Sequence, residues 1–350
     1  MNLLGLMIAL LVAVSVRAAV SIPANDPHFV YEGRFDLSDP TSPAVIWQAS
    51  RIRLGFTGES LTLLLSQLNG QVFFDATVDG KTTLIALPEQ ASQDRFTLNG
   101  LGAGEHQLVL FKRSEANAGW VRFRGVELAD GAKPIGATVP AYTHRIGFIG
   151  DSITVGACNE DGASDQWEDR RTHNAALSYA ALTAAALNAS HRNIAVSGMG
   201  IVLGWVPQLA GDTWNRVYPN PESPIAPHTA WEPEVVFINL GENDSSRSAA
   251  LHQPFPSAKF TLGYVALARA VRSRFPKTEI VALRGGMGGG ANNPELRAAW
   301  EAAVQELERA DAHVHHFVFK HWSEPHPRVA DDRAMADELV AWLKQQPFLK

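Results

Sequence analysis

The periodicity of hydrophobic residues changes once along the chain, and this change limits the folds that the sequence can adopt. From residue 31 to residue 128, hydrophobic and other residues alternate with a period of two, as in Arg51-Ile-Arg-Leu-Gly-Phe56, and no helical stretch interrupts them. The dipeptides Asn69-Gly70 and Asp79-Gly80 suit tight hairpin turns, because Asn, Asp and Gly tolerate a positive φ. This pattern predicts several short strands arranged as a β-sandwich or jelly roll.

A different organisation begins after residues 129–140, which are rich in Gly, Pro and Ala and read as a linker. Beyond them, apolar runs of strand length alternate with helical segments. The predicted strands are residues 146–149, 193–196, 235–240, 280–283 and 314–319, and the predicted helices are residues 175–187, 264–274, 295–309 and 334–343. Such alternation indicates βαβ units and a parallel sheet covered on both faces. We therefore expect a β-sandwich domain at residues 20–138, including the linker, and an α/β domain at residues 139–350.

The N-terminus has the features of an export signal. Residues 3–16 are nearly all apolar and are followed by Arg17-Ala18-Ala19. The run is too short for a spanning helix, and small residues stand where a signal peptidase cuts. We predict a cleaved signal peptide at residues 1–19, a secreted or periplasmic location, and no membrane attachment after cleavage; a retained anchor is the alternative. The net charge of −6, without a basic block, gives no reason to expect nucleic-acid binding.

Three features that resemble cofactor or metal sites are interpreted as structural. Cys158, the only cysteine, has no activating motif around it, so we expect a partly buried residue beside a turn. The histidines at 313, 315, 316 and 321 lack further ligands at the spacing that zinc requires, so no metal is expected. The glycine-rich run at residues 286–291 is not followed by a clear ribose-binding acid, and we interpret it as a loop near the functional site rather than a dinucleotide turn.

Polar residues follow several of the predicted strands. Ser152 ends the sequence Gly150-Asp151-Ser152 after the first strand, Gly198 follows the second, and Asn243 follows the third, while His326 lies between two prolines after the last. Because the carboxyl ends of parallel strands meet at one edge of a sheet, we expect these residues to lie together. A reactive serine needs a base and donors for an oxyanion, and this set contains both.

The four motifs Gly-Asp-Ser, Ser-Gly-x-Gly, Gly-x-Asn-Asp and His-Pro, in this order, resemble the blocks of the SGNH (GDSL-type) hydrolase superfamily. The resemblance implies a flavodoxin-like, three-layer α/β/α domain with Ser152 as nucleophile and His326 as general base. It also implies an oxyanion hole made by the backbone amides of Ser152 and Gly198 and the side chain of Asn243.

A β-sandwich ahead of such a domain, together with Asn159-Glu160 after the serine motif, makes the chain similar to carbohydrate esterase family 2. The stretch around Arg34 and residues 45–56 is similar to that family's N-terminal jelly roll. This resemblance implies an acetyl xylan esterase type of activity: a serine esterase that removes O-acetyl groups from xylan-like poly- or oligosaccharides through an acetyl-enzyme, without a cofactor.

Two positions depart from the superfamily pattern. Ser323 stands where the superfamily usually has an aspartate three residues before the histidine. We therefore expect either a Ser–His dyad oriented by a backbone carbonyl or an orienting group from another loop. Glu242 replaces a residue that is more often small and polar, and we expect its side chain to face solvent.

Two alternatives to polysaccharide deacetylation remain open. One is a lipid or short-chain acyl esterase of the same superfamily; the other, motivated by Ser323, is a carbohydrate-binding protein with a degenerate hydrolase domain. Three tryptophans, Trp205, Trp214 and Trp231, lie between the Gly198 and Asn243 loops. Trp205 is nearest in sequence to Gly198 and is our candidate for contact with a sugar. Packing in the core is the competing interpretation. The sequence does not indicate an oligomeric state.

Overall fold

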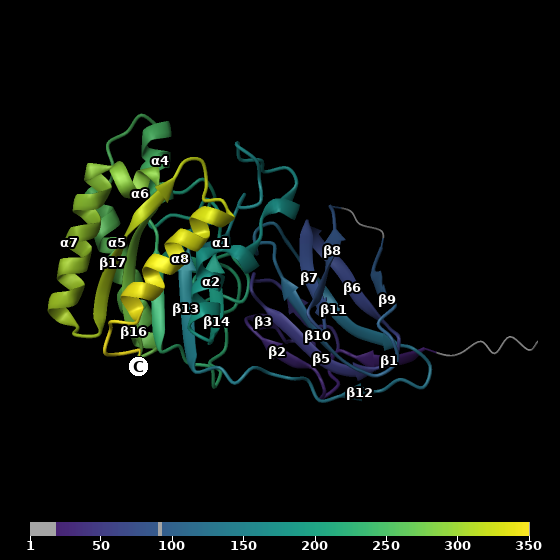
Figure 1. Ribbon diagram of the computed structural model, residues 1–350. Coiled ribbons are helices and arrows are strands. Elements are labelled where there is room, and N and C mark those ends of the chain that lie inside the picture. Colours follow the sequence, from purple (N-terminus) through teal and green to yellow (C-terminus); the bar gives the residue numbers. More distant parts are fainter. Residues whose placement is uncertain (1–18, 90–92, 350) are drawn as a thin grey trace, which may run out of the picture.

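The computed structural model describes residues 19–89 and 93–349, which form two domains side by side (Figure 1). Nearly all of the predicted signal peptide lies outside the described residues. The N-terminal domain is all-β and the C-terminal domain is α/β, as the sequence predicts.

The N-terminal domain consists of two antiparallel sheets packed face to face. Their inner faces supply one apolar cluster that includes Leu54, Leu63, Phe74 and Phe123. The first sheet contains, in spatial order, β3 (Phe35–Asp36), β4 (Ala44–Val45), β11 (Gly119–Leu128), β6 (Ser60–Gly70) and β9 (Arg95–Asn99), and β1 (Val20–Pro23) also pairs with β11. The second contains β12 (Pro134–Ile135), β5 (Arg51–Thr57), β10 (Glu105–Lys112), β7 (Val72–Val78) and β8 (Lys81–Leu87), and β2 (Val30–Glu32) pairs with β5.

The two predicted hairpin turns have different outcomes. Asp79-Gly80 joins β7 to its antiparallel partner β8, which confirms that prediction. Asn69-Gly70 ends β6, whose partners are β9 and β11, whereas β7 belongs to the opposite sheet. The prediction of a hairpin there is wrong: Gly70 does adopt a positive φ of 59°, but it carries the chain from one sheet to the other. Part of the predicted linker also joins the sandwich, since β12 pairs with β5.

The C-terminal domain is built on a five-stranded parallel sheet. Its spatial order is β14 (Ala189–Ala195), β13 (His144–Gly150), β15 (Val235–Asn239), β16 (Glu279–Met287) and β17 (Val314–Ser323). Numbered within the domain, this order is 2-1-3-4-5, which is that of the flavodoxin-like fold. Every predicted strand is present, although the observed strands are mostly longer.

Alternate residues of these strands face opposite helical layers, which completes the three-layer fold. Phe148 and Phe237 pack with α2 (Tyr179–Ala186) and α8 (Val329–Leu343). Ile149 and Ile238 pack on the other side with α5 (Ser257–Arg274) and α7 (Pro294–Ala310). The remaining helices are α1 (Ser152–Val155), η1 (Arg170–Thr172), η2 (Ala175–Leu177), α3 (Ala210–Thr213), α4 (Glu242–Ala250) and α6 (Gly288–Asn292).

The predicted helix at residues 175–187 is interrupted. Ser178 has an extended backbone, and its side chain accepts the N–H of Ala181 at 3.3 Å, so that α2 begins there and η2 stands apart. A serine side chain offers the backbone this alternative to a continuous helix.

The two domains share a hydrophobic core. Ala44, Ile46, Trp47 and Ala116 of the β-sandwich belong to the same buried cluster as the α5 face of the parallel sheet. The buried side chain of Gln48 also donates to the carbonyl of Ala195 at the end of β14, at 2.8 Å. The β-sandwich is therefore fixed beside the carboxyl end of β14.

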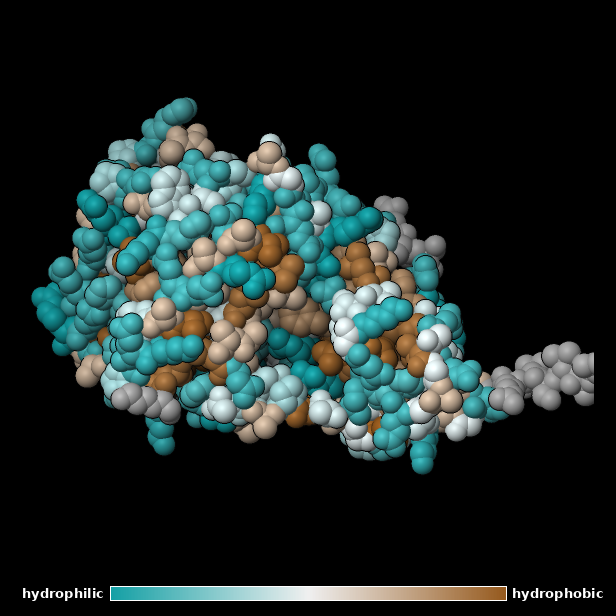
Figure 2. All heavy atoms as spheres, in the orientation of Figure 1, coloured by the Kyte–Doolittle hydropathy of each residue, from teal (hydrophilic) through white to brown (hydrophobic). Residues whose placement is uncertain are grey.

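The surface seen in Figure 2 is mostly hydrophilic and is hollowed where the two domains meet. Within the part of the chain that the structure describes, none of the helices combines the length and apolar character needed to cross a membrane.

Candidate active site

Ser152 lies at the start of α1, directly beyond the carboxyl end of β13. The turn is tight: a Cβ atom at Gly150 would overlap the side chain of Thr154. Asp151 caps the helix, because its Oδ1 accepts the N–H of Ile153 at 3.1 Å. Glycine and a capping aspartate before the serine therefore allow the strand to turn abruptly and present the hydroxyl.

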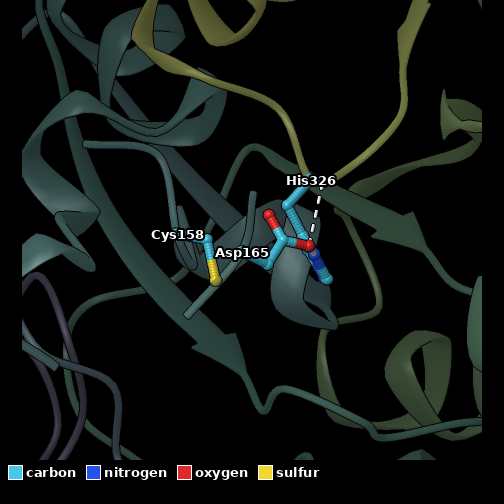
Figure 3. Close-up of side chains that lie close together, drawn as sticks. All are labelled: Cys158, Asp165 and His326. Atoms are coloured by element: carbon cyan, nitrogen blue, oxygen red, sulfur yellow. Dashed lines mark hydrogen bonds and ion pairs between the residues drawn. The ribbon is translucent and has the colours of Figure 1, made fainter. Parts of the chain in front are cut away.

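The structure brings Ser152 and His326 together, as the sequence predicts. The loop between β17 and α8 places the Nε2 atom of His326 2.9 Å from the Oγ atom of Ser152. The other ring nitrogen, Nδ1, lies 2.6 Å from Oδ2 of Asp165 (Figure 3). Since a carboxylate only accepts hydrogen bonds, Nδ1 carries the proton and Nε2 is left as the acceptor for the serine hydroxyl.

Asp165 supplies the orienting group that the Ser323 substitution removes from its usual place. It belongs to the irregular segment between α1 and η1, so the expectation of an orienter from another loop is met and a backbone carbonyl is not needed. Ser323 itself lies apart from the imidazole nitrogens, with its Oγ 3.2 Å from the carbonyl of Pro325. The sequence showed that residue 323 is not the usual aspartate. Nothing in the sequence distinguished Asp165 from the other acidic residues of its segment.

The carboxylate of Asp165 is held in its ionised form. Burial opposes ionisation, but hydrogen bonds and charge from His326 and a hydrogen bond from Arg328 outweigh it and lower the pKa of Asp165 to about 2. The Nη1 atom of Arg328 lies 2.9 Å from Oδ1, the oxygen that does not face Nδ1 of His326. Asp165 is thus fixed from both sides and carries its charge at any pH near neutrality.

Ser152, Gly198, Asn243 and His326 all line one pocket of about 420 Å³. Gly198 has a φ of 83°, and a Cβ there would press on Trp205 and Val206, so this close approach favours glycine. The pocket is large enough for a sugar unit next to the serine.

The amide of Asn243 is already engaged. Its Nδ2 atom lies 3.1 Å from Oδ2 of Asp151 and 3.0 Å from the carbonyl of Met199, which accounts for both N–H groups. Burial raises the pKa of Asp151 well above its usual range, and the charge of Glu242 raises it further. The Asn243 amide is therefore held in place by groups of the protein itself.

Asp244, the next residue, fixes the loop that carries Gly198. Its two carboxylate oxygens accept the backbone N–H groups of three consecutive residues, Ile201, Val202 and Leu203, at 2.8–2.9 Å. The Gly-x-Asn-Asp motif therefore positions its neighbouring loop as well as contributing Asn243 to the pocket.

The expectation that Glu242 faces solvent is wrong. Its carboxylate accepts the N–H groups of Gly289 and Gly290 at 3.1 and 2.7 Å. The start of α6 is thus occupied by a protein carboxylate, which argues against a phosphate there. The prediction of a loop at residues 286–291 is wrong, because they form the end of β16 and most of α6, but they do lie near the site, since Met287 lines the pocket. The reason sequence reasoning missed this contact is that the glycine-rich run lies almost fifty residues away.

Aromatic rings border the pocket. Trp205, which is 52% exposed, lines it, and its ring is covered on one side by the guanidinium of Arg247. Trp167, which the sequence did not single out, stands edge-on to the ring of His326 with 5.2 Å between centroids. Trp214 is buried and Trp231 lies elsewhere, so of the tryptophans weighed from sequence only Trp205 borders the serine.

The β-sandwich contributes to this pocket through the loop between β10 and β11, which supplies Glu115 and Asn117. Glu115 is buried, and its Oε2 accepts the N–H of Ser197 at 2.8 Å, next to Gly198. Sequence periodicity could not place this loop, because it belongs to the other domain.

Cys158 packs as a structural residue. It is fully buried, more so than we expected, and burial raises the pKa of its thiol. Its sulfur lies close enough to Asp165 and His326 for the three to hold a metal ion (Figure 3). We assign none, because the carboxylate and the imidazole are bonded to each other and Arg328 places a positive charge against them.

The clustered histidines in and just before β17 pair with carboxylates: His313 and His315 with Glu279, His316 with Glu308, and His321 with Asp331. Within residues 19–89 and 93–349, these histidines are in no group that meets the geometry of a metal site.

Comparison with known proteins places this arrangement in a family. Residues 31–137 match the model "Carbohydrate esterase 2 N-terminal", and residues 148–341 match "GDSL-like Lipase/Acylhydrolase family". A solved structure of a family two carbohydrate esterase from Clostridium thermocellum, in complex with cellohexaose, is 32% identical, with a TM-score of 0.80 over 92% of this chain and 100% of that one. The chain belongs to carbohydrate esterase family 2.

Two curated relatives extend the match. This family 2 esterase is 32% identical to the cellulase/esterase CelE of Acetivibrio thermocellus. The match covers 92% of the present chain but only 40% of CelE. It is 27% identical to an acetylxylan esterase / glucomannan deacetylase of Cellvibrio japonicus, over 98% of both chains.

Proposed function

We propose that this family 2 esterase removes O-acetyl groups from polysaccharides by way of an acetyl-serine. The observation that carries the proposal is the continuous chain of hydrogen-bonding groups from Asp165 through His326 to Ser152, which ends at the wall of an open pocket. In this arrangement Ser152 is the nucleophile, His326 the general base and Asp165 the group that orients it.

In the first half of the reaction, the Oγ atom of Ser152 forms a bond to the acetyl carbon while Nε2 of His326 takes the hydroxyl proton. The tetrahedral intermediate collapses by breaking the bond to the sugar oxygen, which receives that proton from His326. In the second half, water attacks the acetyl-serine with His326 again as base, the bond between the Oγ atom and the acetyl carbon breaks, Ser152 takes the proton back from His326, and acetate leaves. Asp165 stays ionised throughout and stabilises the imidazolium.

The backbone amides of Ser152 and Gly198 are the proposed main donors to the oxyanion, and the Asn243 amide is the third. Asn243 would exchange its bond to Asp151 for one to the oxyanion. A preorganised donor of this kind contributes about 3–4 kcal/mol at the transition state.

A carbohydrate substrate is supported by the aromatic border of the pocket and by relatives named for acetylxylan and glucomannan. Trp205 offers an exposed ring face for a sugar, next to the loop that bears Gly198. The signal-like residues 1–19 support export to the periplasm or the medium, where such polysaccharides are found.

The decisive experiment compares wild type with Ser152→Ala on 4-nitrophenyl acetate and on acetylated xylan, glucomannan and oligosaccharides, with acetate release measured and the position of loss read by NMR. Thermal unfolding confirms that the variant is folded. We expect the variant to lose at least 10³-fold in kcat. Equal, slow turnover by both proteins contradicts an enzymatic function and favours carbohydrate binding alone. Preference for long acyl chains favours the lipid esterase alternative.

A further inference from the structure

A second cavity, separate from the active site, lies between the two domains. It has a volume of about 750 Å³ and shares no lining residue with the pocket of Ser152. One wall comes from residues 31–38 of the β-sandwich, around β2 and β3, which lie on the side of that domain nearest the parallel sheet (Figure 1). The other wall comes from Arg192 of β14, from residues 217–231 and from the end of α5.

Arginines from three parts of the chain, Arg34, Arg192 and Arg274, line this cavity. Their hydrogen bonds are to neutral oxygens. Arg34 Nη1 donates to the carbonyls of Trp214 and Arg216 at 2.7 and 2.9 Å. Arg192 Nη2 donates to the hydroxyl of Thr229 at 3.2 Å, and Arg274 Nη2 to the carbonyls of Ala226 and Pro227 at 2.6 and 3.3 Å.

No carboxylate of the described residues is paired with these arginines. Across residues 19–89 and 93–349, none of the three arginines forms an ion pair, and the buried Nε–H group of each has no acceptor. Asp36 also lines the cavity and contributes one negative charge, but it contacts none of the three arginines by a hydrogen bond: its Oδ2 accepts the hydroxyl of Tyr218 at 2.7 Å and its Oδ1 accepts the N–H of Ser38 at 3.0 Å. The three guanidinium groups therefore bring positive charge to the cavity wall without an ion pair, and a cleft lined by charge of one sign favours a ligand of the opposite sign.

The charges also act on one another. Burial, together with the charges of Arg192 and Arg274, lowers the pKa of Arg34 to about 9, and burial together with the charge of Arg274 lowers the pKa of Arg192 to about 10. In a chain whose net charge is −6, this is a local concentration of positive charge. An anion in the cavity would relieve the repulsion.

The walls indicate what carries the anion. Trp231, Tyr218 and His228 line the cavity, and the guanidinium of Arg192 lies over the Trp231 ring at 4.2 Å. Planar guanidinium groups bind carboxylates through paired hydrogen bonds, and aromatic rings pack against the apolar faces of sugars. The volume suits a mono- or disaccharide and is far larger than an inorganic ion requires.

We propose that the cavity between the domains is a binding site for a carboxylate-bearing sugar, with Arg192 and Arg274 as the groups that hold the carboxylate. The choice of a sugar as the carrier rests on the proposed function; the preference for an oxyanion rests on the arginines alone. The site would let the protein hold an acidic unit of a polysaccharide at a distance from the ester that it hydrolyses.

The test measures binding to the full-length mature protein by isothermal titration calorimetry and by the change in Tm. The probes are glucuronate, glucose, acetate and inorganic phosphate at constant ionic strength. The variants are Arg192→Gln and Arg274→Gln; Arg34 is left intact because it joins the domains. Arg269→Gln is the matched control, since Arg269 lies on the same helix as Arg274 but is exposed and pairs with Glu306.

We expect glucuronate to bind wild type and Arg269→Gln and to raise Tm, glucose and acetate to have little effect, and both cavity variants to bind at least tenfold more weakly. Equal responses to glucose and glucuronate, or unchanged binding by both cavity variants, overturn the proposal. Binding of phosphate but not of glucuronate overturns the sugar-acid assignment.

Ser152→Ala separates this proposal from the proposed function. It should bind glucuronate as wild type does, because the two cavities are distinct. A failure of the acetyl-serine mechanism would appear as undiminished ester hydrolysis by Ser152→Ala, and it would leave the binding result unchanged.

Discussion

Replacement of Asp165 by asparagine tests the least expected part of the active site. In the wild type, Oδ2 accepts the Nδ1 proton of His326 across 2.6 Å, a short charge-assisted bond. An asparagine amide in the same position can donate to Nδ1, which moves the ring proton to Nε2. A protonated Nε2 cannot accept the proton of Ser152, and the developing imidazolium also loses its counter-charge.

Loss of both effects should lower kcat by about 10⁴-fold, equivalent to about 5 kcal/mol of transition-state stabilisation. The Asp165→Asn fold should persist, because Arg328 still donates to the carbonyls of Cys158 and His326 at 3.1 and 2.9 Å. Since the pKa of Asp165 is lowered to about 2, the carboxylate is ionised above that pH, and the deficit should be of similar size from pH 5 to pH 8.

The assay is steady-state hydrolysis of 4-nitrophenyl acetate and of an acetylated oligosaccharide, with Tm as the check on folding. Ser323→Ala is the matched control and should keep nearly all activity, because Ser323 does not contact the imidazole ring. If Asp165→Asn retains more than a tenth of the wild-type kcat, or if Ser323→Ala is the more damaging change, the assignment of Asp165 is refuted.

Glu115→Ala removes the acceptor for the N–H of Ser197. Because the adjacent Gly198 amide should then shift, kcat on an aryl acetate should fall about 10- to 100-fold with little change in KM. A change in KM alone would contradict this expectation. Trp205→Ala should raise KM about tenfold on acetylated polysaccharide but not on an aryl acetate, and equal effects on both would argue against sugar stacking. In the β-sandwich, the hydrogen bond that His106 donates to Asp79 raises the pKa of His106 against the effect of burial. The resulting stabilisation is complete below about pH 6.5 and is lost as the pH rises through the higher folded-state pKa. The Tm difference between wild type and Asp79→Asn, measured by calorimetry, should therefore shrink from pH 6 to pH 9, whereas a constant difference would exclude this linkage.

Residues that follow strands were predictable and the residue that completes the triad was not. Ser152 and His326 are placed by the parallel sheet, whose strands can be read from short apolar runs. Asp165 lies in an irregular segment that also contains Asp161, Glu168 and Asp169. No periodicity distinguishes one acid from another there, so only the three-dimensional path of the segment selects it.

Contacts between distant segments were missed for the same reason. Turn chemistry correctly gave a positive φ at Gly70, but it contains no information about which sheet the next strand joins. Glu242 meets Gly289 and Gly290, and Glu115 meets Ser197, across long separations in sequence. Local propensities predict elements well, whereas pairing between elements depends on the packing of the whole chain.

The hydrophobic cluster that joins Trp47 to the α5 side of the parallel sheet limits which part of this protein can be transferred to another chain, in evolution or by engineering. Separation of the domains would expose apolar surface on both, so we expect the two to unfold in one cooperative transition and the hydrolase half to be insoluble alone. The unit that can be transferred between proteins is then the β-sandwich and the α/β domain together. That view agrees with the match to CelE, in which a stretch corresponding to 92% of this chain, both halves together, makes up 40% of a larger protein.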